Sequence, residues 1–140
     1  MGCCDDTDSA CVFSRALLAR SAGCACVARR ALGEREVLEC TQPVARTNCS
    51  LLSALMRERA RFALKLPAGE LPLMHAQVLR LQCGGLHGLQ QTLGTSDTDV
   101  HHLVTAAQAQ FGSLLALPWD QVVTAMRAWQ LRRRRPSGAA

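Results

Sequence analysis

The segment from Pro43 to about Leu66 carries the clearest helical pattern in the sequence. At about 100° per residue, its apolar side chains fall on one side of a helix and its charged side chains on the other. The apolar set is Leu51, Leu52, Leu55, Met56, Phe62, Ala63 and Leu66. A proline in the first turn of such a helix costs little, because the N–H that it lacks would have no partner there. The pattern therefore predicts one long amphipathic helix, whose apolar side other elements must cover.

Further helical segments are predicted on both sides of this helix. Two helical pieces are expected between Cys11 and Leu32, with Gly33 as a stop signal, followed by a short helix that ends near Cys40. Later helices are expected from Pro72, from about Asp99 to Gln110, and from Trp119 to Leu131. No stretch shows the period-2 alternation of a strand. The predicted fold class is all-α, a single-domain bundle of five or six helices with short connections.

The chain of 140 residues has the length of one domain, and its 49% hydrophobic content suffices for an ordinary core. Residues 1–10 are predicted to form a flexible N-terminal arm, 11–131 the helical domain, and 132–140 a disordered arginine-rich tail. The formal net charge of +5 falls to +1 without the four arginines at 132–135. The body is thus nearly neutral and lacks a basic stripe with interleaved aromatic residues, which argues against nucleic-acid binding.

Eight cysteines are many for this length. The N-terminus lacks the pattern of a secretory signal, and no window approaches the roughly 18 apolar residues of a membrane span. We therefore expect no membrane span, a cytoplasmic location and a reducing environment, where stable disulfides are rare. In that setting, grouped cysteines more often bind metal or take part in redox chemistry.

From Cys11 onward the cysteines follow the spacing C-x12-C-x-C-x13-C-x8-C, with no C-x2-C pair. This spacing argues against zinc ribbons and bacterial-type ferredoxins. The thiols instead lie where predicted helices begin or end, and free amides at helix N-termini stabilise thiolates. The resulting hypothesis is an iron–sulfur cluster bound by four thiolates, with zinc as the alternative metal. Its ligands would be Cys11, Cys40 and Cys49, with either Cys24 or Cys26. Arginines that could balance the negative charge of such a cofactor are Arg15, Arg46 and Arg59.

Cys83 and His87 form a second candidate pair. They are four residues apart, a spacing at which two side chains on one helix can chelate one metal ion. Cys83 is therefore a spare or second-site thiol in this interpretation. Gly84 and Gly85 lie between them, and each costs roughly 1 kcal/mol relative to alanine inside a helix. Either a neighbouring helix, cofactor or partner approaches closely there, or the helix kinks and Cys83 is an ordinary core residue.

The sequence predicts a small cysteine-rich helical metalloprotein in electron transfer or redox sensing, with a redox enzyme or regulator as protein partner. No motif of a hydrolase, metalloprotease or phosphate-binding loop occurs, which favours a role other than substrate turnover. Two alternatives stay open. The chain could be a metal-free helical interaction module, or a thiol–disulfide switch that uses Cys24 and Cys26. The thiols could also be inert core residues.

Overall fold

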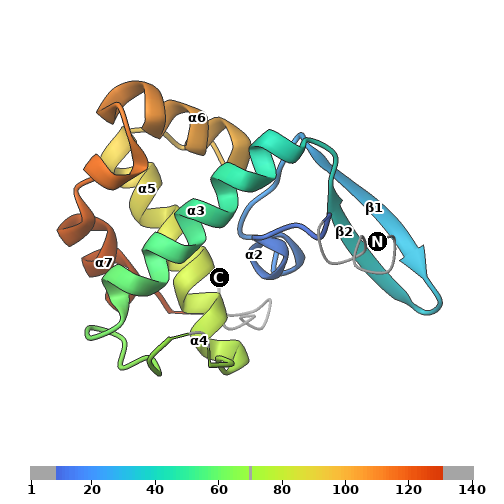
Figure 1. Ribbon diagram of the computed structural model, residues 1–140, viewed down its shortest axis with the longest axis horizontal. Coiled ribbons are helices and arrows are strands. Elements are labelled where there is room, and N and C mark those ends of the chain that lie inside the picture. Colours follow the sequence, from blue (N-terminus) through green and yellow to red (C-terminus); the bar gives the residue numbers. More distant parts are fainter. Residues whose placement is uncertain (1–8, 70, 131–140) are drawn as a thin grey trace, which may run out of the picture.

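The computed structural model describes residues 9–69 and 71–130 (Figure 1). Most of the predicted N-terminal arm, the last predicted helical residue Leu131 and the tail 132–140 lie outside the described residues. The elements, in chain order, are α2 (Ser14–Leu18), β1 (Val27–Leu32), β2 (Arg35–Cys40), α3 (Pro43–Ala60), α4 (His75–Leu79), the π-helical turn η2 (Arg80–Gly84), α5 (Gly85–Leu93), α6 (Val100–Phe111), the 3₁₀ turn η3 (Leu114–Ala116) and α7 (Trp119–Ala128).

The predicted all-α class is wrong, because the segment expected to be helical up to Cys40 contains a β-hairpin. Strands β1 and β2 pair antiparallel, with Val27 opposite Cys40 at one end and Leu32 opposite Arg35 at the other. Gly33, predicted to end a helix, opens the two-residue turn with a φ of +65°. Glycine adopts such an angle without strain, and it is favoured in tight hairpin turns for that reason. The fold is therefore mixed α/β.

The hairpin extends away from the helices, which explains why its strands lack an alternating pattern (Figure 1). In β2 only Leu38 is buried, and most side chains in the outer part of the hairpin face solvent. Two ion pairs cross the strands, an exposed pair of Arg29 with Glu36 at 2.6 Å and a pair of Arg30 with the partly buried Glu39 at 3.3 Å. Surface pairs of this kind contribute about 0–1 kcal/mol each, so the root of the hairpin must supply most of its stability.

Helix α3 crosses the other helices (Figure 1). Its apolar side chains join theirs in one core cluster. Leu52 and Met56 are completely buried, as the periodicity predicts. The helix ends at Ala60, however, and Phe62 beyond it is 86% exposed, contrary to the prediction that it lies on the buried side. The core that α3 covers is built from α5, α6 and α7, with Phe13 next to α2 as its N-terminal part.

Candidate functional site

Five cysteines approach one another at the junction between the hairpin and the helices; we call them the thiol site. Cys11 precedes α2, Cys24 and Cys26 lie on the loop before β1, Cys40 ends β2, and Cys49 lies in α3. All five are free thiols and partly buried. They come from four separate stretches of chain, so tertiary structure alone brings them together.

Backbone hydrogen bonds hold Cys11 beside the end of β2. The amide of Cys11 donates to the carbonyl of Leu38 at 3.0 Å, and the amide of Cys40 donates to the carbonyl of Ser9 at 2.7 Å. Residues Ser9 to Cys11 thus run alongside β2 like a short additional strand. This pairing fixes the backbone of Cys11 relative to that of Cys40.

The hairpin fixes Cys26 relative to Cys40. Both the amide and the hydroxyl of Thr41 donate to the carbonyl of Cys26, each at 2.7 Å. The amide of Val27 also donates to the carbonyl of Cys24 at 3.2 Å, which closes a tight turn over the two cysteines. The thiol of Cys40 itself donates to the carbonyl of Gln42 at 3.3 Å, just before α3 begins.

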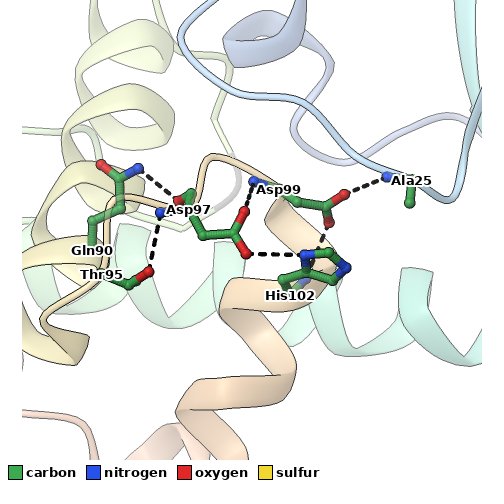
Figure 2. Close-up of polar contacts among 6 residues, drawn as sticks. All are labelled: Ala25, Gln90, Thr95, Asp97, Asp99 and His102. Carbon is green, nitrogen blue, oxygen red and sulfur yellow. Dashed lines mark hydrogen bonds and ion pairs between the residues drawn. The ribbon is translucent and has the colours of Figure 1, made fainter.

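The loop that carries Cys24 and Cys26 is attached to the start of α6. Gly23 donates its amide to the carbonyl of Thr98 at 2.9 Å and accepts from the amide of Val100 at 2.8 Å. The carboxylate of Asp99 accepts from the amide of Ala25 at 2.7 Å, between the two cysteines (Figure 2). Asp99 is also the N-cap of this helix. The contact to Ala25 joins residues 74 positions apart, so no local sequence pattern predicts it.

Burial and the neighbouring thiols raise the pKa of Cys11, Cys26 and Cys49. Burial, then the neighbouring cysteines Cys24, Cys11, Cys40 and Cys26, raise the pKa of Cys49 to about 12. Burial raises the pKa of Cys11 to about 11, with further increases from Cys24 and Cys40. Burial, Cys24 and Cys40 also raise the pKa of Cys26, and its thiol is hydrogen-bonded to that of Cys24. A thiolate at Cys11, Cys26 or Cys49 would therefore meet the negative charge of neighbouring thiolates, which favours the protonated form of these three thiols.

The side chains of the thiol site are not arranged in a finished coordination geometry. Within residues 9–69 and 71–130, no three His, Cys, Asp or Glu side chains are placed so that they could hold a metal ion as they stand. The thiols nevertheless lie within electrostatic reach of one another, as their pKa values show. Ligation by four of them would therefore require their side chains to draw closer together.

Of the three arginines expected near the cofactor, one acts on the thiol site. The charge of Arg46 lowers the pKa of Cys11, and its Nε donates to the carbonyl of Ala10 at 2.8 Å. Arg15 instead pairs with Nδ1 of His75 at 2.6 Å. Arg59 is exposed near the end of α3, ten residues beyond Cys49, which corresponds to about 15 Å along the helix.

Cys83 and His87 lie apart from the thiol site, along a groove between the segment after α2, α5 and α7. The groove has a volume of about 1020 Å³. The Cys83 thiol is buried and receives a hydrogen bond from the side chain of Ser21, while Nε2 of His87 lies 3.2 Å from Nε2 of Gln91. Burial raises the pKa of the Cys83 thiol. The structure therefore does not place this pair near the five cysteines of the thiol site.

No protein-family model, no curated protein and no solved structure matches the chain. In the stretches 9–69 and 71–130, no helix combines the length and the apolar character needed to cross a bilayer.

Proposed function

We propose that the thiol site binds an iron–sulfur cluster and that the protein serves in electron transfer or redox sensing. Its setting would be the cytoplasm, with a redox enzyme or regulator as partner. The single observation that carries this proposal is the approach of thiols from four segments of chain to one place. Four thiolates are the usual ligand set of such clusters.

The electrostatics of the thiols support a cationic occupant. Without one, burial and mutual repulsion keep Cys11 and Cys49 protonated. A centre that contains ferric or ferrous iron offsets the charge of several thiolates, and binding then releases their protons. Arg46, whose charge already acts on Cys11, would offset part of the remaining negative charge.

The electrostatics also favour Cys24 over Cys26 as the fourth ligand. Cys24 is the thiol with the largest effect on the pKa of both Cys11 and Cys49. Cys26 comes last among the thiols that act on Cys49, and it is absent from those that act on Cys11. We therefore propose Cys11, Cys24, Cys40 and Cys49 as ligands, with Cys26 as a fifth thiol at the edge of the site.

The test is the metal and acid-labile sulfide content of protein purified without oxygen. We expect two or four iron atoms per chain with an equal amount of sulfide, and visible absorption at about 400 nm. Cys49→Ser should lose both iron and sulfide. Cys83→Ser is the matched control and should retain them, because Cys83 lies outside the thiol site. Protein with neither iron nor sulfide would refute the proposal, and zinc without sulfide would indicate a structural Cys₄ zinc site instead.

A thiol–disulfide switch is the second candidate, and the hydrogen bond between the thiols of Cys24 and Cys26 favours it. In such a switch both thiols lose a proton and together give two electrons to an oxidant such as a peroxide or another disulfide, and one S–S bond forms. Mild oxidation of metal-free protein would then lower its mass by about 2 Da, reversibly on addition of a dithiol. Cys26→Ser, which cannot form this disulfide, is the reference. If wild-type protein showed no larger mass decrease than Cys26→Ser, the switch would be excluded.

A further inference from the structure

Asp99 uses its two carboxylate oxygens on two different elements (Figure 2). Oδ1 accepts from the amide of His102 at 3.1 Å, the N-cap interaction of α6. Oδ2 accepts from the amide of Ala25 at 2.7 Å. The first contact is what any capping residue makes, whereas the second reaches 74 positions back along the chain. Capping of α6 does not require the contact to Ala25.

The turn before α6 holds the Asp99 backbone in place. Oδ1 of Asp97 accepts from the amide of Asp99 at 2.9 Å, and Oδ2 of Asp97 lies 3.0 Å from Nδ1 of His102. Gln90 and Thr95 in turn hold the backbone of Asp97, through its carbonyl at 2.8 Å and its amide at 3.1 Å (Figure 2). These contacts thus hold the turn from which the Asp99 side chain projects.

The segment opposite Asp99 is the one that carries two thiols. Three hydrogen bonds join residues 23–25 to residues 98–100, two of them on the backbone of Gly23 and the third from Ala25 to Asp99. Among these, only the third uses a side chain. It also acts at the position between Cys24 and Cys26, so its loss would remove the hydrogen bond that holds the backbone between the two thiols.

We propose that Asp99 is a positioning residue of the thiol site, which holds the backbone of the Cys24–Cys26 loop beside Cys11, Cys40 and Cys49, where the metal centre would bind. This inference rests on the proposed function. Residues that orient metal ligands without touching the metal typically contribute about 10-fold to 100-fold in affinity. A carboxylate suits this task because it accepts from two N–H donors at once, one on the helix and one on the loop.

The test compares Asp99→Ser with Asp99→Ala. A serine retains the N-cap hydrogen bond but is too short to reach Ala25 as well, whereas alanine loses both contacts. With the anaerobically purified full chain, we expect both variants to release iron to a chelator about 10-fold to 100-fold faster than wild type. Asp120→Ser, which changes an acidic residue in the first turn of α7, is the matched control and should behave as wild type.

A purely structural role gives a different result. If Asp99→Ser releases iron at the wild-type rate while Asp99→Ala is faster, Asp99 is only a helix cap and the inference is wrong. Thermal unfolding of both variants serves as the folding control, since Asp99→Ser should keep most of the stability of α6.

A second measurement separates this inference from the proposed function. Hydrogen exchange over residues 23–26 in the metal-free protein should be faster in both Asp99 variants than in wild type and in Asp120→Ser. Unchanged exchange in Asp99→Ser would overturn the positioning role. Wild-type protein without iron and sulfide would instead refute the proposed function, and the exchange result would still decide whether Asp99 fixes the loop.

Discussion

Gly88 on α5 lies directly against the backbone of Val122 on α7. A Cβ atom at Gly88 would come within 3.0 Å of the Val122 Cα atom and 3.1 Å of its carbonyl oxygen. One turn earlier, a Cβ atom at Gly84 would lie 2.9 Å from the Cα atom of Met126. The segment formed by η2 and α5 therefore approaches α7 so closely that only glycine fits at these two positions. This explains why glycines occur inside a helical segment.

Alanine at Gly84 or Gly88 should destabilise the protein. Each added methyl meets backbone that cannot move independently, and overpacking of this kind costs about 1–3 kcal/mol. That cost outweighs the gain of roughly 1 kcal/mol in helix propensity. Gly85→Ala should cost less, because its Cβ would meet the sulfur and terminal methyl of Met56, the end of a flexible side chain. The measurement is the free energy of unfolding in urea.

Gly23→Ala is the control for these variants. A Cβ atom there would meet nothing within 4 Å, and its φ lies outside the left-handed region, so its free energy of unfolding should stay within about 0.5 kcal/mol of wild type. Increased stability of Gly84→Ala and Gly88→Ala would contradict the close approach of α5 and α7.

The sequence predicted elements whose pattern is local and missed those that depend on pairing. Leu52 and Met56 are buried on α3 because the helical period alone places them on one face. The hairpin could not be predicted in this way, since Leu38 is the one buried residue of β2 and the remaining alanines, arginines and glutamates favour helices. Its stability comes from contacts with Ser9 to Cys11 and with α3, which lie outside the segment itself.

The sequence named the cysteines of the candidate site, but not the contacts that bring them together. Cys11, Cys40 and Cys49 were grouped because they lie near expected helix ends. The structure instead brings Cys26 and Cys40 together through the pairing of strands, and Cys11 through a backbone bond to β2. Which thiols bind a cluster stays a prediction. Asp99 was missed because its partner lies far away in the sequence.

Gln82 in η2 links the helical body to α2, and its replacement should be costly. Its Oε1 accepts from the amide of Ala16 and its Nε2 donates to the carbonyl of Val12, both at 3.0 Å in a partly buried setting. Gln82→Ala leaves both backbone groups without this partner, which should lower the free energy of unfolding by about 1–3 kcal/mol. Gln82→Glu should be worse still, since it loses the donor and introduces a charge.

The control for Gln82 is Gln121→Ala, a change at an exposed position, which should alter the free energy of unfolding by less than about 0.5 kcal/mol. If Gln82→Ala had the same free energy of unfolding as wild type, the two hydrogen bonds would not stabilise the attachment of α2.

High pH should destabilise the metal-free protein. The pKa values of Cys11 and Cys49 in the fold, about 11 and about 12, lie above the reference value of 9.0 that applies when the chain unfolds. Between these values the unfolded chain binds fewer protons than the folded chain, so stability falls as pH rises. The stabilisation is present in full below pH 9 and is lost progressively as pH rises towards 12. Urea unfolding of the metal-free protein at pH 7.5, 9 and 10.5 measures this decline.

Cys49→Ala should show a shallower decline over the same pH range, because one group with a raised pKa is gone. A stability that stays constant from pH 7.5 to 10.5 would contradict the burial and crowding of these thiols.

Cys24 and Cys26 should differ in their importance for iron binding, although they are two residues apart and share one loop. Cys24 has the larger effect on the pKa of Cys11 and of Cys49, whereas Cys26 acts on Cys49 last among the thiols. We therefore expect Cys24→Ser to lose iron and sulfide and Cys26→Ser to retain both at wild-type content, with unchanged visible absorption. Serine is suited to both positions because it removes the thiolate ligand with little change in size. Retention in Cys24→Ser together with loss in Cys26→Ser would assign the fourth ligand to Cys26, and the loop would then have to turn its outer thiol inward when it binds the metal.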